Sequence, residues 1–375
     1  MHAPGSVERL HYMDHLRALA MLAGVFFHAA LAYSPLMQPF WPLADRQASQ
    51  AVDALAWGLH LVRMPLFFLV AGFFAAFVAQ RRGGVGLARQ RVRRLLLPFL
   101  VAWPLAWLAM SASTGWALKH VEHPSGFLEL VREWLAQPDR PRTPPGTAHL
   151  WFLYYLLLLA VLHWVARTLE LARPAGRLLE RHPAWVLLGL PVLLVPMLAS
   201  VSAPHPAPEG LLPQFWALGF YGAFYALGAL LHGQPQWLAR VRPWLGGLVL
   251  ASAVAYLAFL LGLGAHVRTA TPASTASVWL AALEGLLAVW LTVACLLLGQ
   301  RWLDRPRPLM RYLAHGAYWT YLWHLPLLFA LQYWLMDRDW PWPLKFAFAS
   351  GATLALCLLS YQLLVRHTPL RRFVG

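Results

Sequence analysis

The sequence predicts an all-α polytopic membrane protein, a bundle of about ten transmembrane helices that forms one domain over residues 1–375. Hydrophobic residues make up 59% of the chain and charged residues only 12%, whereas soluble domains are about 45–50% apolar and about 25% charged. The mean hydropathy is +0.53. Apolar stretches of about 18 to 26 residues recur along the chain, each long enough to cross roughly 30 Å of hydrocarbon.

The predicted helices follow from the positions of these apolar stretches, because a helix rises about 1.5 Å per residue and needs about 20 residues to cross a bilayer. Connections that carry charged residues separate them. In chain order, we expect membrane-spanning helices at His15–Leu36, Ala54–Ala79, Leu95–Ser113, His149–Ala166, Ala184–Val201, Gln214–His232, Trp244–Gly262, Ser277–Gly299, Tyr312–Trp334 and Leu344–Val365.

The positions of the basic residues explain the net charge of +15. Most of them fall in the connections on the same side as the N-terminus, and the positive-inside rule assigns that side to the cytoplasm. We therefore expect both termini to be cytoplasmic and the first helix to act as an uncleaved anchor. Because the charge reports topology, we expect the lipid bilayer as a partner and no nucleic acid. Cys295 and Cys357 lie in apolar segments and indicate neither a disulfide nor a zinc site.

The stretch DHLRALAMLAGVFFH, from Asp14 to His28, places polar side chains on an otherwise apolar helix. Arg17 and His28 are eleven residues apart, so they differ by roughly 20° around the helix and about 16 Å along it. They share one face and are separated by about half the thickness of the bilayer core. Asp14 precedes Arg17 by one turn, so an i, i+3 ion pair can orient the guanidinium.

Other polar side chains also fall within apolar segments, where each costs several kcal/mol unless it faces a cavity or a partner. Arg63 is expected at the depth of His28, roughly 12 to 13 Å below the outer surface. His60 lies on the face of Arg63, one turn nearer the outside. His149 begins the fourth segment, and His324 lies near the middle of the ninth. The matching depth of Arg63 favours a functional role for His28 over an isolated packing role.

Several of these polar residues also have a purely structural explanation. An intramembrane histidine can simply bond to a neighbouring helix, and the backbone carbonyl freed by Pro326 offers His324 such a partner. Glu284, roughly 10 Å into the eighth segment, is either a base or a neutral acid in a hydrogen bond. His11 and His15 have the i, i+4 spacing of a metal-binding pair, but no third ligand is near them, so no metal site is expected.

The run from Asp14 to His28, with ten residues between Arg17 and His28, resembles the signature of the membrane acyltransferases called acyltransferase family 3. Further blocks resemble that family in the same order along the chain: RMPLFFLVAGFF (63–74), RQRVRRLLLP (89–98), HLWFLYY (149–155), YLWHLPL (321–327) and HTPLRRF (367–373). Many members have Ser before the glycine of the second helix, where this chain has Ala71. No serine nucleophile is therefore carried over to this position.

The resemblance implies an enzyme without a permanently bound cofactor, whose donor substrate is acyl-coenzyme A (acyl-CoA), either succinyl-CoA or acetyl-CoA, on the cytoplasmic side. The acceptor is implied to be a carbohydrate on the far side of a bacterial inner membrane. The pattern is most similar to a branch that is implied to transfer succinyl groups onto osmoregulated periplasmic glucans. No pattern in the sequence indicates an oligomeric state.

The resemblance also implies roles for particular residues. His28 would act as general base on a sugar hydroxyl, and Arg63 would stabilise the thioester oxyanion or bind the free carboxylate of a succinyl group. Arg17, oriented by Asp14, would bind a phosphate of CoA. The residues expected to contact substrates are Arg17, Asp14, Arg91, Arg94, His60, His149, Glu284 and His324. Direct transfer and a route through an acyl-histidine both stay open.

Two alternative functions are compatible with the same residues. One is the O-acetylation of another cell-surface polysaccharide. The other is a non-enzymatic transporter or lipid-linked sugar flippase, in which the same histidines and arginines form a substrate or proton pathway. The sequence shows no convincing internal repeat and few acidic residues in its apolar segments, which disfavours transport.

Overall fold

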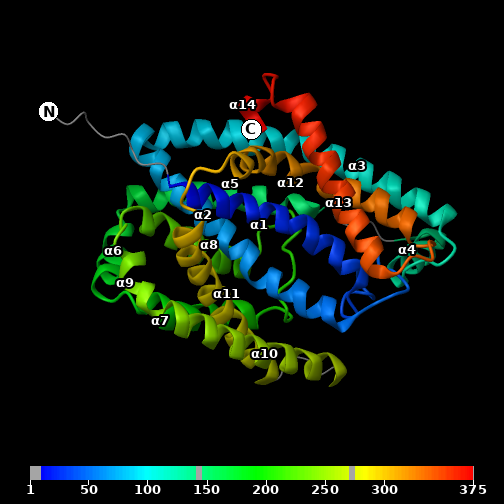
Figure 1. Ribbon diagram of the computed structural model, residues 1–375, viewed down its shortest axis with the longest axis horizontal. Helices are drawn as coiled ribbons and strands as arrows, with labels where there is room; N and C mark the ends of the chain where they lie inside the picture. The colour runs from blue at the N-terminus through cyan, green and yellow to red at the C-terminus, as the bar shows by residue number, and fades with distance from the viewer. Residues whose placement is uncertain (1–9, 141–145, 270–274, 375) are drawn as a thin grey trace.

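The computed structural model describes residues 10–140, 146–269 and 275–374, which form an all-α bundle (Figure 1). Within these residues no β-strand occurs, and a single isolated bridge pairs Gly146 with Gly210. The predicted fold class is confirmed.

Ten long helices occur among the described residues: α1 (His11–Ala30), α2 (Gln50–Arg91), α3 (Leu97–His120), α5 (Trp151–Thr168), α7 (Trp185–Ala199), α8 (Phe215–His232), α10 (Leu245–Thr269), α11 (Thr275–Trp302), α12 (Pro308–Leu335) and α13 (Trp342–Ser360). The shorter segments are α4 (Gly126–Ala136), α6 (Ala172–Arg181), α9 (Trp237–Val241), α14 (Arg371–Val374), the 3-10 turns η1 (Leu31–Tyr33), η3 (Ala148–Leu150) and η4 (Arg242–Trp244), and the π-helical turns η2 (Val92–Leu96) and η5 (Tyr361–Val365).

Each of the ten predicted apolar segments overlaps one of the long helices. In the described part of the chain, seven stretches are long and apolar enough to cross a membrane, and one of them, Gln50–His120, contains both α2 and α3. Helix α7 is apolar but has only 15 residues. Helix α12 has 28 residues but is not among the seven, because histidines, tyrosines and tryptophans lower its hydropathy.

The basic connection after the second apolar segment is helical. Helix α2 continues through Arg81 and Arg82 and changes direction at Gly83, whose φ of 68° lies in the left-handed region that favours glycine. The π-helical turn η2 then leads directly into α3. This connection therefore holds its arginines on an ordered backbone instead of an open loop.

Helix α1 lies at the centre of the bundle and packs against α2, α11, α12 and α13 (Figure 1). Helices α2 and α8 approach most closely at two glycines. A Cβ atom on Gly72 would clash with the carbonyl oxygen of Tyr225, and one on Gly228 would clash with that of Leu69. Small residues let membrane helices pack backbone to backbone, so this contact explains why a glycine follows Ala71.

Candidate functional site

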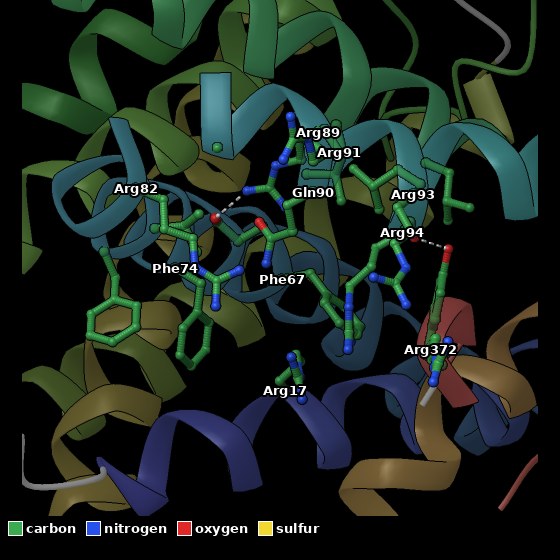
Figure 2. Close-up of a pocket in the computed structure, with 18 of the residues that line it drawn as sticks. Arg17, Phe67, Phe74, Arg82, Arg89, Gln90, Arg91, Arg93, Arg94 and Arg372 are labelled. Atoms are coloured by element: carbon green, nitrogen blue, oxygen red, sulfur yellow. Dashed lines mark hydrogen bonds between the residues drawn. The ribbon is translucent and has the colours of Figure 1, made fainter. Parts of the chain in front are cut away.

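A cavity of about 1170 Å³ lies beside the basic connection, and its wall is rich in arginine (Figure 2). Helices α1, α2, α5 and α12, both π-helical turns and α14 contribute to this wall. The arginines are Arg17, Arg81, Arg82, Arg89, Arg91, Arg93, Arg94, Arg371 and Arg372. None of the described lining residues is acidic, so the cavity has a strongly positive potential and suits an anionic ligand.

Specific contacts fix parts of this arginine-lined cavity. Arg17 pairs with Asp14 at 3.5 Å, as the i, i+3 spacing predicts. The guanidinium of Arg91 donates to the carbonyl oxygen of Ala71 at 3.4 Å, and the hydroxyl of Tyr318 donates to the carbonyl oxygen of Arg94 at 2.7 Å (Figure 2). π-Helical turns are frequent at functional sites, and here two of them supply arginine or tyrosine side chains to one cavity.

A second group of predicted residues forms a cluster of aromatic rings deeper in the bundle. The ring of His28 on α1 lies 5.3 Å from that of His324 on α12 and 5.9 Å from that of Trp41, measured between centroids. The ring of His149 lies 5.4 Å from that of His324. Three histidines that are far apart in the sequence thus meet at one place.

Two of these histidines are bound to backbone carbonyls of α12. His149 Nε2 lies 3.1 Å from the carbonyl oxygen of Leu322, the carbonyl that loses its i+4 partner because Pro326 has no N–H. His324 Nδ1 lies 2.8 Å from the carbonyl oxygen of Tyr321. His149, and not His324, is therefore the hydrogen-bond partner of the carbonyl that the proline leaves free. This hydrogen bond joins η3, which directly precedes α5, to α12.

His28 differs from both neighbours. Its side chain is only half-buried, and in the described chain neither ring nitrogen has a hydrogen-bond partner. A ring without such a partner keeps its lone pair and its N–H available for a ligand. Among the three clustered histidines, His28 is thus the one whose ring nitrogens are not used by the fold.

Arg63 on α2 and His28 both contact the ring of Phe27. The guanidinium of Arg63 lies 4.8 Å from the centre of the Phe27 ring, and that ring lies 5.1 Å from the ring of His28. The absence of a side chain at Gly24 leaves room for it, since a Cβ there would be 3.2 Å from Nη1 of Arg63. Arg63 has no acidic partner among the described residues, so an anionic ligand would compensate a charge that the protein leaves unpaired.

The arginine-lined cavity ends before it reaches the histidine cluster. Met21 and Phe67 are the lining residues closest to His28 and Arg63 along α1 and α2, and Phe152 also lines the cavity. The rings of Phe67 and Phe152 lie 5.1 Å apart. Met21 is seven residues before His28, about 10 Å along the helix, and Phe67 is one turn beyond Arg63, about 6 Å. A layer of apolar side chains thus separates the two halves of the candidate site.

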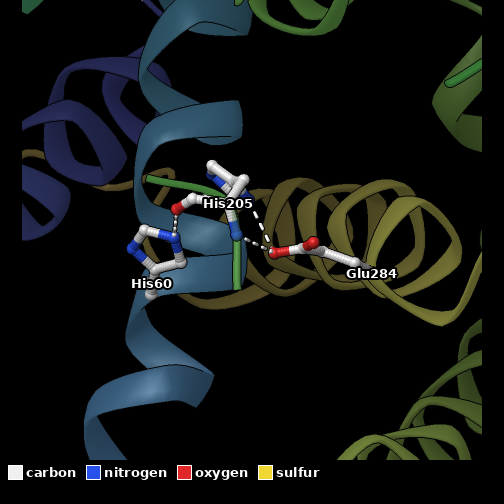
Figure 3. Close-up of side chains that lie close together, drawn as sticks. All are labelled: His60, His205 and Glu284. Carbon is white, nitrogen blue, oxygen red and sulfur yellow. Dashed lines mark hydrogen bonds and ion pairs between the residues drawn. The ribbon is translucent and has the colours of Figure 1, made fainter. Parts of the chain in front are cut away.

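His60 and Glu284 belong to a neighbouring polar cluster that contains His205 (Figure 3). The loop between α7 and α8 folds inward, so that His205 is only 1% exposed. Glu284 Oε1 accepts from the backbone N of His205 at 3.0 Å and lies 2.6 Å from its Nδ1. Glu284, which has no evident partner in the sequence, is thus paired with a residue that sequence analysis did not select.

The predicted site residues thus fall into two groups. Arg17, Asp14, Arg91 and Arg94 belong to the cavity region, and His28, Arg63, His60, His149, His324 and Glu284 belong to the connected ring clusters. The basic connection from Arg81 to Arg94, which the family resemblance suggests could hold further phosphates of CoA, does line the cavity. Sequence analysis missed Trp41, His205, Arg371 and Arg372 as site residues. The two arginines lie in the last block of the family resemblance (367–373), which was the available signal, whereas nothing in the sequence marks Trp41 or His205.

Comparison with known proteins identifies the family of this chain. The chain matches the acyltransferase domain of acyltransferase family 3 over residues 10–362, which include every helix from α1 to α13. It is similar to glucans biosynthesis protein C of Salmonella paratyphi B, Salmonella dublin and Salmonella enteritidis, with 26% identity over 333 residues, 85% of this chain and 82% of each relative. No solved structure matches it. Because the family match covers almost all of the chain and both groups of candidate residues, the protein belongs to this family and is a membrane acyltransferase.

Proposed function

We propose that this acyltransferase moves a succinyl group from succinyl-CoA, bound in the arginine-lined cavity, to a hydroxyl of a periplasmic glucan at His28. The observation that carries the proposal is the position of the arginine-lined cavity relative to His28 and Arg63. An anion-binding cavity with nine arginines ends one apolar layer away from a histidine whose ring nitrogens are unused and from an arginine without an acidic partner.

The arginine-lined cavity, where we propose that the donor binds, suits the negative charge of CoA. CoA carries three phosphate groups, and arginine binds phosphate oxygens in bidentate fashion through its planar guanidinium. Arg17, Arg94 and Arg372 approach the cavity from α1, η2 and α14 (Figure 2), so phosphates at different positions along the ligand can be bound at once. The pantetheine arm then extends toward His28, and the Phe67 side chain must move to let it pass.

The chemistry follows from the two residues at the reacting centre. The neutral imidazole of His28 accepts the proton of the acceptor hydroxyl while that oxygen attacks the thioester carbonyl. The tetrahedral oxyanion lies near the guanidinium of Arg63, which stabilises its charge. Collapse of the intermediate breaks the carbon–sulfur bond, and the imidazolium returns its proton to the CoA thiolate. The products are an ester and free CoA, so no external oxidant or base is consumed.

The succinyl group and the glucan are proposed from two observations. The similar proteins are named glucans biosynthesis protein C, and Arg63 offers an uncompensated cation to a group with a free carboxylate. O-acetylation of another polysaccharide would use the same base but leave Arg63 without that carboxylate. The family assignment disfavours transport as the function.

We place the protein in a bacterial inner membrane with the arginine-lined cavity and both termini on the cytoplasmic side. Arg17 near the start of α1 and Arg371 and Arg372 on α14 line the same cavity, so the first and last helices share one end of the bundle. The concentration of arginine at that end agrees with the positive-inside rule.

This proposal can be tested in proteoliposomes in which the acceptor and the donor are on opposite sides of the membrane. Labelled succinyl-CoA is added outside vesicles that enclose a glucan, and the enclosed glucan is then recovered. We expect labelled ester in the lumen, with an equal amount of free CoA outside, and no label with His28→Ala. Label that appears only on glucan added to the donor side would contradict transfer across the membrane, and equal use of acetyl-CoA would contradict succinyl specificity.

A further inference from the structure

We propose that His60, His205 and Glu284 form a binding site for a zinc ion, next to the reacting centre but separate from the donor cavity (Figure 3). One potential ligand atom from each residue lies within 4.8 Å of those of the other two. The residues come from α2, the loop between α7 and α8, and α11. Their proximity therefore depends on the tertiary fold and not on a local sequence motif.

The three side chains are buried and incompletely paired. His60 is 9% exposed, and His205 and Glu284 are each 1% exposed. Nδ1 of His60, Nε2 of His205 and Oε2 of Glu284 are all buried without a hydrogen-bond partner. An unpaired polar atom in the interior costs about 1–3 kcal/mol, and each of these side chains keeps a lone pair for a ligand when it turns that atom toward the other two. A cation is such a ligand.

The donor set fits zinc better than other common cations. Two imidazoles and one carboxylate are the protein ligands of several zinc enzymes, whereas calcium and magnesium prefer oxygen ligands alone. Zinc with ligands at about 2.0–2.2 Å in a tetrahedron holds its donor atoms roughly 3.3 Å apart. The present spacing of up to 4.8 Å therefore needs a contraction of up to about 1.5 Å, which rotation of the Glu284 carboxylate and the two rings provides.

Existing contacts keep the three side chains next to one another in the absence of a metal. His60 Nε2 lies 2.9 Å from the carbonyl oxygen of His205, and Glu284 Oε1 lies 2.6 Å from His205 Nδ1. Each side chain that uses one polar atom in these contacts retains a second atom that has no partner. Zinc bound by three such ligands keeps a fourth position for a water or a substrate oxygen.

The site adjoins the proposed reacting centre through one aromatic ring. The ring of His60 stacks on that of Phe27 at 5.7 Å, and the guanidinium of Arg63 lies 4.8 Å from the centre of the same ring. Zinc at this position would fix the inward loop between α7 and α8 against α2 and α11. The inference does not depend on the identity of the acyl group or the acceptor.

The full-length protein in detergent, produced without a polyhistidine tag, allows a direct test. It is stripped with a chelator, incubated with excess zinc sulfate, desalted and measured by elemental analysis. We expect about one zinc per chain and a thermal unfolding midpoint that rises with zinc concentration. Glu284→Gln and His205→Ala should each lose the bound zinc and the zinc-dependent rise. His182→Ala and Glu129→Gln, which alter exposed residues elsewhere, should keep both.

Glu284→His provides a second variant if the neutral substitutions fail to fold, because it retains three ligands and should still bind zinc. A wild-type chain that holds no zinc after loading would overturn the proposal. Zinc retained in full by Glu284→Gln and His205→Ala would place the metal elsewhere and would overturn it equally. Zinc content is measured without donor or acceptor, so either result leaves the transfer experiment unaffected.

Discussion

The imidazole rings of His28 and His324 lie 5.3 Å apart, but the fold uses them differently. His324 Nδ1 is bound to the carbonyl oxygen of Tyr321 on its own helix, whereas neither ring nitrogen of His28 has a partner in the described chain. A histidine that the fold does not hold by a hydrogen bond is free to exchange a proton with a substrate. This contrast separates the proposed base from its structural neighbours.

The bond from His149 to the carbonyl of Leu322 predicts a coupling between His149 and Pro326. His149→Ala leaves that carbonyl unpaired, which should lower the free energy of unfolding by about 1–3 kcal/mol. In a Pro326→Ala background the new N–H at position 326 can pair with the carbonyl, so the loss should shrink. Thermal unfolding of the two single variants and the double variant measures the coupling. Additive effects would show that the proline does not create the need for His149.

Arg63 should discriminate between donors. Arg63→Gln removes the cation that faces the succinyl carboxylate, so kcat/KM for succinyl-CoA should fall by about 100-fold or more, while the fall for acetyl-CoA should be clearly smaller. Arg63→Lys keeps the charge without the planar fork and should recover part of the loss. Equal losses with the two donors would show that Arg63 acts only on the reacting carbonyl.

Phe67 should control passage between the cavity and His28. The larger side chain in Phe67→Trp should lower kcat/KM for the donor by roughly tenfold, since 1 to 2 kcal/mol of added strain lies within the cost of overpacking. Phe67→Ala should instead release CoA faster when no acceptor is present, because water gains access to the thioester. Phe348→Trp, on an exposed part of α13, is the matched control. Unchanged kinetics in both Phe67 variants would mean that the donor takes another path.

The arginines of the cavity should set donor affinity. Arg372→Ala and Arg94→Ala should each raise KM for succinyl-CoA, with the KM for the acceptor unchanged, because each removes a contact to a phosphate. Both effects should weaken as salt concentration rises, since exposed charges are screened. Arg177→Ala on α6 lies outside the cavity lining and should leave both constants as they are. A change in the acceptor KM alone would count against a donor site here.

The sequence was sufficient for the features that depend on position along one helix. The apolar segments and the i, i+3 pairing of Asp14 with Arg17 follow from composition and helical periodicity, and counting residues from the segment ends put His28 and Arg63 at one depth. In the structure both side chains contact the Phe27 ring. These features require only the rise and rotation of a helix.

Other features depend on contacts between segments that no periodicity encodes. His205 reaches Glu284 because a loop turns into the bundle, and Trp41 reaches His28 from the segment after η1. The contact between the rings of Phe67 and Phe152, where the cavity ends, depends on how α2 packs against α5. The carbonyl freed by Pro326 was foreseeable, but its partner was decided by the packing of η3 against α12, which brings His149 to it.

The measurement that tests the central claim most directly is the turnover of His28→Ala with succinyl-CoA and glucan, compared with wild type and with the surface variant His182→Ala. We predict that kcat falls by about 10²–10⁴-fold while donor binding to the arginine-lined cavity is kept, as measured by the dissociation constant for CoA. Turnover of His28→Ala at the wild-type rate, with the donor bound as tightly, would show that another residue accepts the proton.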